Sequence, residues 1–217
     1  MTDAAGVVPL FPLPNAVLLP RAILPLHIFE ERYRKMTADT LRSHRQIAMA
    51  VLRKGWERDY YARPAIEPVV CVGTILSHEE LPDGRYNLLL QGRTRARVVE
   101  EVGDEPYRQA RLAAIAETGG SESDLAAERG RLVELLGRPA YAALPGVEQI
   151  CRMAAAGMST SDVADLAAST LLPDAEVALR LSLLGEADVG VRVRRVLEAV
   201  EALRPAWRNI PDDAGMN

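Results

Sequence analysis

The sequence predicts an α+β protein, with a strand-rich first part over residues 1–118 and a bundle of helices over residues 119–205. Five prolines between Val7 and Tyr33 exclude a helix there, because proline fixes φ and lacks a backbone donor. Up to about residue 118, apolar runs are separated by turn residues at roughly ten-residue intervals, which is typical of a barrel or sandwich. Beyond residue 120, apolar residues recur at helical spacing.

The first part begins with extended segments that bend at the prolines and are apolar enough to enter a core. Further along, the Asp-Gly pair at residues 83–84 lies between two apolar runs, which predicts a β-hairpin with a type I′ turn. In the strand after this turn, alternation places Leu88 and Leu90 on one face and Asn87 and Leu89 on the other.

Three other segments complete the first part. One helix, over about residues 30–43, interrupts the strands. Gly73 and Gly92 lie inside strand patterns, which indicates bends or a close approach of two backbones. The run over residues 108–117 is ambiguous, because its alanines favour a helix whereas its alternation favours a strand.

The second part contains five predicted amphipathic helices. The clearest carries an apolar stripe from Val189 to Leu203, with Arg192 off that stripe. Asp188 is expected to be its N-cap, and Pro205 is expected to end it. The other four are expected at residues 123–136, 145–156, 162–171 and 174–184. Residues 206–217 are expected to form a flexible tail.

The composition, with 48% hydrophobic and 26% charged residues, is that of an ordinary globular protein. No apolar run reaches about 18 residues, and the first residues lack the pattern of a signal peptide, so a cytoplasmic location is expected. Cys71 and Cys151 are far apart and make no metal or redox spacing. The net charge of −4 argues against a general nucleic-acid binder.

The search for catalytic motifs finds none. The phosphate-binding pattern G-x-x-x-x-G-K-[ST] is absent. His78-Glu79 begins like the zinc-protease signature, but Pro82 occupies the place of the second histidine. Lys35 and Lys54 are the only lysines, and neither has a serine in a matching motif nearby, so a Ser-Lys dyad has no support. The sequence therefore predicts no enzyme, no cofactor and no metal site.

A loop bounded by glycine and proline is the first candidate for binding. It carries Trp56, Tyr60 and Tyr61 together with Arg63, and aromatic side chains with arginine are favoured anchors at interfaces. The alternative is that these aromatic side chains cover the end of the barrel or the helix beside it.

A row of arginines is the second candidate. Alternation places Arg93, Arg95 and Arg97 on one side of a strand, where they could contact a phosphate backbone or an acidic peptide. The alternative is an exposed strand face paired with nearby acids such as Glu100 and Glu101.

Four blocks, in order, resemble the N-terminal domain of the Lon protease family. They are the proline-cornered opening (PLFPL, VLLP and a second PL before FEERYRKM), the strand QIAMAVL at residues 46–52, the "VGT" strand at residues 71–75, and the hairpin at residues 81–98. The resemblance implies a PUA-like β-barrel, with residues 108–117 as a strand that closes it, followed by a helical bundle.

The resemblance also implies a non-catalytic polypeptide-binding module that captures unfolded or extended segments. A hydrophobic groove between barrel and bundle is expected to accept such a segment, with the loop aromatics as anchors and arginine side chains meeting acids. The ATPase and protease modules of the family are not found in this sequence, so the expectation is a free-standing adaptor or regulator of protein quality control, with a protease or chaperone as partner. Because PUA folds also bind RNA, the alternative is an RNA-binding module that uses the Arg93, Arg95 and Arg97 face.

Overall fold

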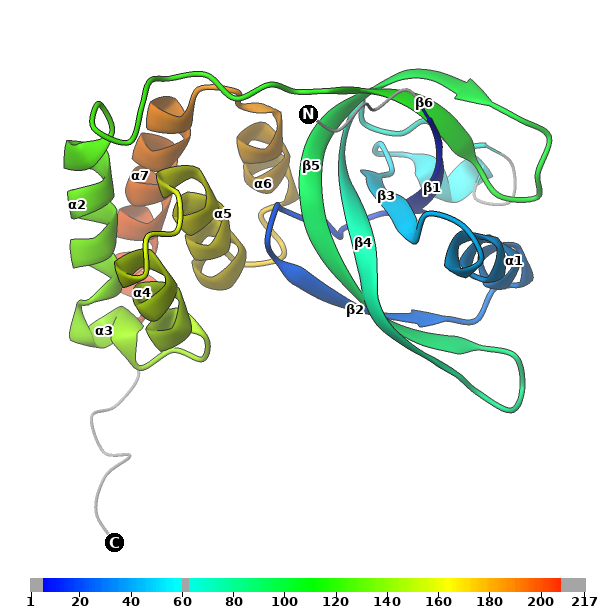
Figure 1. The fold of residues 1–217 in the computed structure, drawn as a ribbon, viewed down its shortest axis with the longest axis horizontal. Coiled ribbons are helices and arrows are strands. Elements are labelled where there is room, and N and C mark those ends of the chain that lie inside the picture. Colours follow the sequence, from blue (N-terminus) through cyan, green and yellow to red (C-terminus); the bar gives the residue numbers. More distant parts are fainter. Residues whose placement is uncertain (1–5, 60–62, 208–217) are drawn as a thin grey trace, which may run out of the picture. The chain divides into compact units, whose positions relative to one another are not determined.

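A computed structural model describes the backbone of residues 6–59 and 63–207 (Figure 1). The chain forms two compact units, which we call the sheet unit and the helical unit. The sheet unit comprises Met1–Ala116 and Asp174–Gly185, and the helical unit comprises Glu117–Pro173 and Glu186–Asn217. No helix within the described ranges is both long and apolar enough to cross a bilayer.

The sheet unit is built on one mixed six-stranded sheet. Its strands are β1 (Val7–Leu13), β2 (Ile23–Ile28), β3 (Gln46–Val51), β4 (Val69–Glu80), β5 (Tyr86–Val102) and β6 (Gln109–Ala114). Their order is β2-β5-β4-β3-β1-β6, and β6 also pairs with β5. Strands β1, β3, β4, β5 and β6 therefore close into a ring, whereas β2 pairs only with β5 among the described strands. Among the strands that the structure describes, only β1 and β3 pair in parallel.

Strands β1 and β3 are buried on both faces, which explains why their sequences are almost continuously apolar. One buried cluster joins residues of five strands, among them Leu10, Ala48 and Ala110. Helix α1 (Glu31–Leu41) packs against β1, and the rings of Phe11 and Tyr33 meet edge to face with centroids 4.6 Å apart. The helix expected near residues 30–43 is confirmed.

Helix α6 (Val177–Gly185) belongs to the sheet unit, because it packs on β4 and β5. The sequence pattern had placed this helix in the bundle. An amphipathic stripe shows that one face of a helix is buried, but the stripe does not show which element buries it. The run that could have been helix or strand, residues 108–117, contains strand β6.

The close backbone approach expected at Gly92 is confirmed. A Cβ atom at Gly92 would lie 2.2 Å from the carbonyl oxygen of Leu19, so only glycine fits there without a shift of the backbone. Gly92 pairs with Gly73 beside an irregularity in the register between β4 and β5. This irregularity is a β-bulge, which bends the strands.

The hairpin between β4 and β5 is also confirmed, but the predicted turn type is wrong. The N–H of Leu81 donates to the carbonyl of Arg85, and the N–H of Gly84 donates to the carbonyl of Leu81, both at 2.8 Å. Gly84 has a φ of +75°, whereas Asp83 is not among the non-glycine residues with positive φ. A type I′ turn requires positive φ at both central residues. Pro82 holds φ negative and favours a type I turn that ends at Gly84.

The helical unit contains five helices in its described residues. They are α2 (Ala126–Leu136), α3 (Pro139–Ala142), α4 (Val147–Ala155), α5 (Thr160–Leu171) and α7 (Val189–Trp207). Four of them match predicted helices, and the short α3 was not predicted. The N-cap is confirmed, because Asp188 Oδ1 accepts from the N–H of Val191 at 2.8 Å. The predicted end at Pro205 is wrong: α7 continues to Trp207, since a proline in the last turn removes only one backbone donor.

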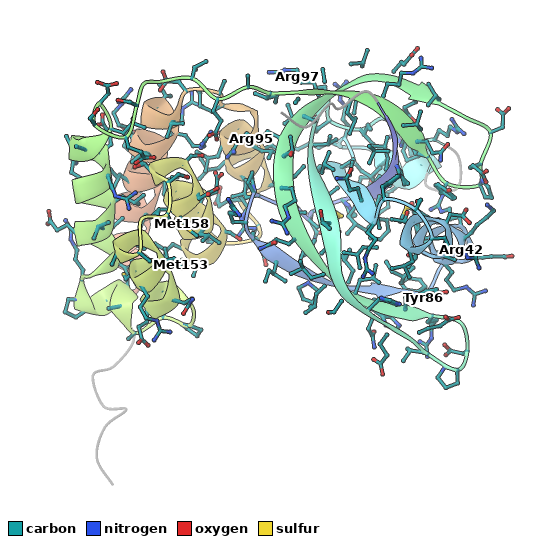
Figure 2. All side chains as sticks on the ribbon, viewed as in Figure 1. Arg42, Tyr86, Arg95, Arg97, Met153 and Met158 are labelled. Atoms are coloured by element: carbon teal, nitrogen blue, oxygen red, sulfur yellow. The ribbon has the colours of Figure 1, made fainter. Side chains whose placement is uncertain are left out.

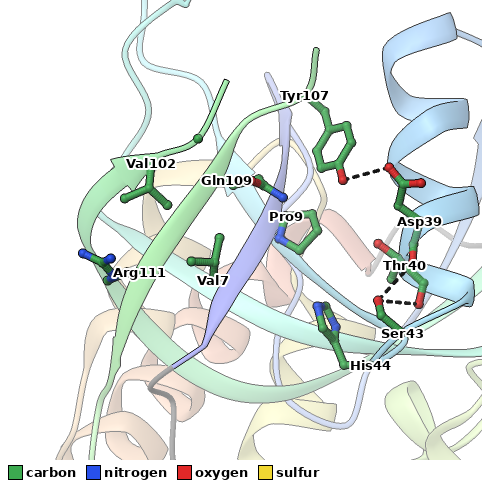
Figure 3. Close-up of a pocket in the computed structure, with 11 residues that line it drawn as sticks. Val7, Pro9, Asp39, Thr40, Ser43, His44, Val102, Tyr107, Gln109 and Arg111 are labelled. Carbon is green, nitrogen blue, oxygen red and sulfur yellow. Dashed lines mark hydrogen bonds between the residues drawn. The ribbon is translucent and has the colours of Figure 1, made fainter. Parts of the chain in front are cut away.

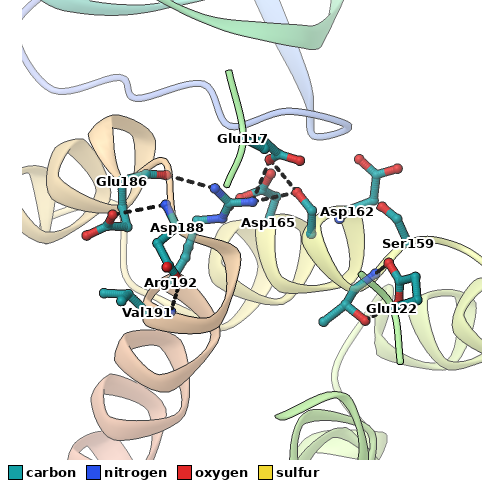
Figure 4. A network of polar contacts seen from close by, with 11 residues as sticks. Glu117, Glu122, Ser159, Asp162, Asp165, Glu186, Asp188, Val191 and Arg192 are labelled. Carbon is teal, nitrogen blue, oxygen red and sulfur yellow. Dashed lines mark hydrogen bonds and ion pairs between the residues drawn. The ribbon is translucent and has the colours of Figure 1, made fainter. Parts of the chain in front are cut away.

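Arg192 is the main departure from the predicted pattern of α7. Its side chain is fully buried although it lies beside the apolar stripe. Its guanidinium contacts Glu117 Oε1 at 2.6 Å, Asp165 Oδ1 at 3.3 Å and the carbonyl of Glu186 at 2.8 Å (Figure 4). Glu117 and Glu186 are the first residues of the two segments that make up the helical unit, so Arg192 joins the beginnings of both segments within that unit.

Candidate functional site

The outer face of β2, β5 and β4 is the candidate functional site, and we call it the three-strand face. The strand register places three rows of side chains across it. Pro25, Leu89 and Ser77 form one row, and His27, Asn87 and Glu79 form the next; Ile23 lies opposite Gln91 in the third. All of these side chains except that of Gln91 are exposed.

The three-strand face presents apolar side chains to solvent. Ile23 is 53% exposed, Leu89 is 41% exposed and Leu76 is 43% exposed. Leu76 lies in a register irregularity between Ile75 and Ser77, so it is an extra residue outside the normal alternation. A hollow of about 460 Å³ crosses all three strands. It is lined by Pro25, Leu26, His27, Ser77, His78, Glu79, Asn87, Leu88 and Leu89.

A chain of polar contacts runs beside these apolar residues. The Asp83 carboxylate binds the Arg85 guanidinium at 2.6 Å, and this contact lowers the pKa of Asp83. Arg85 Nη1 lies 3.2 Å from His27 Nε2, and His27 Nδ1 lies 2.8 Å from Asn87 Oδ1. Asn87 in turn donates to Glu79 at 3.0 Å. Because arginine can only donate, Nε2 of His27 accepts in this contact, and Nδ1 is left to donate to Asn87.

A second hollow, of about 400 Å³, lies between the end of α1 and strands β1 and β6 (Figure 3). The Tyr107 hydroxyl donates to Asp39 Oδ2 at 3.1 Å, and Lys35 Nζ contacts the same carboxylate at 2.8 Å. Burial raises the pKa of Tyr107 to about 12, with help from its bond to Asp39. Burial also lowers the pKa of His44 on the opposite wall. Tyr107, Asp39 and Lys35 are already bound to one another, and His44 accepts from the N–H of Gln46, so packing of the loop before β6 onto α1 explains this hollow.

Asp39→Asn is expected to change how stability depends on pH. The hydrogen bond from Lys35, followed by that from Tyr107, lowers the pKa of Asp39 below its ordinary value. The carboxylate therefore contributes stability above the pKa of the unfolded chain, and that contribution is lost as pH falls through the folded-state pKa. Urea unfolding at pH 7 should show the variant less stable by up to about 1 kcal/mol, and this difference should be smaller at pH 3. An equal difference at both pH values would contradict this.

A third hollow, of about 530 Å³, lies on the helical unit. It is lined mainly by α2 and by the loop after α4, in which Met158 is labelled in Figure 2. Arg129 closes this loop by donating to the carbonyl of Met158 at 2.8 Å and to that of Ala154 at 2.7 Å. The arginine thus caps the end of α4, and the hollow follows from that structural role.

The aromatic loop predicted as a binding anchor is only partly described. Trp56 begins the 3₁₀ helix η1 (Trp56–Asp59) and is half-buried, whereas Arg63 is exposed. Tyr60 and Tyr61 lie outside the described residues. Trp56 and Arg63 are not among the described residues that line the hollow of the three-strand face. The anchor role of these four residues stays a prediction.

The three arginines of β5 do not form one exposed basic face. Arg93 and Arg97 are exposed, but Arg95 is only 4% exposed. Arg95 and Arg97 are labelled in Figure 2. The register between Arg95 and Arg97 is unbroken, so these two side chains share one face of β5, and the burial of Arg95 alone reflects the packing around it. The acids expected as their partners have other contacts: Glu100 binds Arg111, and Glu101 binds Arg108. RNA binding by this strand stays a prediction.

The sequence contains one signal for the apolar character of the three-strand face. Leu89 alternates with buried Leu88 and Leu90, so it had to be an apolar side chain on the outer face. The pairing of Leu89 with Pro25 is a contact across 64 positions in the chain, and alternation alone cannot show it. Among the described residues, no group of three His, Cys, Asp or Glu side chains is placed to hold a metal ion.

Comparison with known families gives a match over almost the whole chain. The model of the ATP-dependent protease La (LON) substrate-binding domain matches residues 7–202. The chain is 26% identical over 206 residues to Lon protease 2 of Myxococcus xanthus, which covers 93% of this chain and 24% of that protein. It is 30% identical over 196 residues to Lon protease 2 of Herpetosiphon aurantiacus, covering 87% and 23%. The chain thus spans about a quarter of the length of these curated relatives.

Two solved structures show the same fold. The Lon N-terminal domain protein from Xanthomonas campestris superposes with a TM-score of 0.63 at 24% identity, covering 89% of this chain and 98% of that one. The N-terminal domain of the Mycobacterium avium complex Lon protease superposes with a TM-score of 0.66 at 16% identity, covering 90% and 98%. The Lon N-terminal fold expected from the four sequence blocks is confirmed, and the PUA-like label stays a prediction.

Proposed function

This chain belongs to the family of ATP-dependent protease La (LON) substrate-binding domains, and on that basis we propose that it is a non-catalytic module that binds extended segments of other polypeptides. The three-strand face is the observation that supports this proposal most directly. It combines exposed apolar side chains with hydrogen-bonding groups along one hollow, which is the chemistry that an unfolded segment requires.

The apolar part of the three-strand face would supply most of the affinity. Leu89 and Ile23 stand in solvent in the isolated chain, so covering them with a partner's apolar side chains removes their surface from water. Burying a leucine side chain contributes about 1.5–3 kcal/mol. Because this term does not depend on ionic strength, such binding should survive high salt.

The polar contacts of the face would orient the bound segment rather than react with it. Asn87, His27 and Arg85 are held by one another, so they can accept or donate in fixed directions. We propose that a segment bound here is delivered to a protease, with this chain acting in protein quality control as a recognition module or adaptor. The relatives named Lon protease support that role.

Leu89→Ser is the variant that tests this proposal, with Val99→Ser as the matched control. Both residues are exposed and apolar and lie on β5, but Val99, at 64% exposed, is not part of the three-strand face. The dissociation constant for fluorescein-labelled β-casein, an unfolded protein, would be measured by fluorescence anisotropy at low and high salt. Leu89→Ser should raise it about tenfold, as expected for the loss of about 1.4 kcal/mol.

The control should leave the dissociation constant within about twofold of the wild-type value. Melting curves of both variants would show that neither change unfolds the sheet unit. The proposal is refuted if the wild type does not bind casein. Equal effects of the two substitutions would instead remove the three-strand face as the binding site.

A further inference from the structure

We infer that β2 receives the bound segment as an additional β-strand along its free edge, an inference that rests on the proposed function and specifies how the segment is held. Strand β2 pairs with β5 on one side and with no other described strand on the opposite side. Such an edge is a ready template for the backbone of an extended chain. Recognition through the backbone also suits a module that must accept many sequences.

The hydrogen bonds around β5 show which residues of β2 face the free edge. The N–H of Gly92 donates to the carbonyl of Ala22, so Ala22 faces β5. At the other end of β5, the N–H of Leu81 donates to the carbonyl of Arg85, so the backbone groups of Arg85 point toward β4. In an antiparallel ladder, facing and non-facing residues alternate.

Both ends of the ladder lead to the same assignment. Counting from Ala22, residues 24, 26 and 28 direct their backbone groups to β5. Counting from Arg85, Asn87 and Leu89 face β4, which again leaves Leu88 and Leu90 to face β2. Ile23, Pro25 and His27 therefore direct their N–H and C=O groups to the free edge.

Pro25 fits this assignment and limits the number of backbone donors that the free edge of β2 offers. A proline in a sheet is tolerated where its missing N–H would point to solvent, as it would here. The edge therefore offers the N–H groups of Ile23 and His27 but none between them. A proline in an edge strand weakens pairing with unwanted strands. The site would bind extended segments with moderate strength and release them, and it would resist permanent edge-to-edge association.

The side chains around this edge suit an apolar segment. In an added strand, alternate side chains would point to the outer face, beside Ile23, Pro25 and His27. The exposed ring of Phe29, which stacks on His27 at a centroid distance of 6.3 Å, extends this surface past the end of β2. The occupant is therefore an extended, mainly apolar polypeptide segment with free backbone donors.

Proline substitution tests the inference, because it removes one outward donor without breaking the ladder to β5. His27→Pro is compared with His27→Ala, which loses the same imidazole but keeps the backbone N–H. With labelled β-casein as the probe, His27→Pro should bind about two- to tenfold more weakly than His27→Ala, as for the loss of one net hydrogen bond. Pro25→Ala restores a donor and should bind about two- to tenfold more tightly than the wild type.

Amide exchange gives a second readout that needs no variant. The N–H groups of Ile23 and His27 should exchange rapidly in the free protein and become protected when casein is added. If casein binds and Leu89→Ser weakens it, but the proline and alanine variants are equal and neither amide is protected, the added strand is overturned while the proposed function stands. If the wild type does not bind casein at all, the proposed function fails and this inference fails with it.

Discussion

Replacing Arg192 with alanine is expected to lower the free energy of unfolding of the helical unit by about 3–5 kcal/mol. The guanidinium is fully buried and contacts two carboxylates, those of Glu117 and Asp165. Ser161 shares the same guanidinium nitrogen as Glu117, with its Oγ at 2.5 Å. Removing the arginine leaves Asp165, which is 1% exposed, as a buried carboxylate without its main counter-charge. Leaving a buried charge unpaired is much more costly than losing an exposed ion pair.

Arg195→Ala is the matched control for this prediction. Arg195 lies on the same helix and pairs with Glu186 at 3.4 Å, but its side chain is 45% exposed. Its loss should cost less than about 1 kcal/mol. Urea unfolding followed by circular dichroism would measure the stability of both variants, because most of the α-helical residues lie in the helical unit. The prediction fails if the two variants differ by less than about 1 kcal/mol.

Gly92→Ala is expected to destabilise the sheet unit by at least about 3 kcal/mol, the upper end of the range for overpacking a core. The added methyl group would lie 2.2 Å from the carbonyl oxygen of Leu19 and 3.2 Å from the sulfur of Cys71. The first of these neighbours is backbone, which cannot rotate away as a side chain can. The segment before β2 would have to move, and with it the bonds that Arg21 and Ala22 make to Gly92.

Gly130→Ala should change the stability in the opposite direction to Gly92→Ala. Gly130 lies inside α2, is exposed, and an added Cβ would meet no atom within 4 Å. Alanine is favoured over glycine in a helix by about 1 kcal/mol, so this variant should be slightly more stable than the wild type. Thermal unfolding of both variants gives the comparison. A Gly92→Ala protein that melts like the wild type would show that the backbone near Leu19 yields easily.

Local patterns predicted much of the fold. The helix α1, the hairpin between β4 and β5 and the cap at Asp188 all follow from residues close together in the chain. Strand β6 was ambiguous in the local pattern and followed from the family resemblance. The family followed from four short blocks in the first hundred residues. The predicted turn type is wrong because Pro82 and Asp83, not Asp83 and Gly84, are the central residues of the turn. The predicted end of α7 is wrong because a proline in the last turn does not stop a helix.

The site was harder to predict because it depends on pairing across long distances in the sequence. The three-strand face forms only when β2 pairs with β5 and β4 bulges at Leu76. The alternation of apolar and polar residues predicts neither the partner of β2 nor the position of the bulge. Alternation also could not predict the burial of Arg95, because Arg95 and Arg97 share one face of β5 and only the packing around them makes one buried and the other exposed. The composition of the aromatic loop predicts binding anchors, but the composition of a loop does not show where that loop lies in the fold.

The discontinuous sheet unit has a consequence for the order in which this protein matures. Residues 174–185 return to the sheet as α6 after the chain has passed through most of the helical unit. During synthesis, strands β1 to β6 leave the ribosome long before the helix that covers β4 and β5, and α7 follows later still. Domains generally fold as units as they are made. Here the newly made sheet remains uncovered until α6 has been synthesised. A fragment that stopped near residue 118 would lack α6 and would expose an apolar surface on β4 and β5.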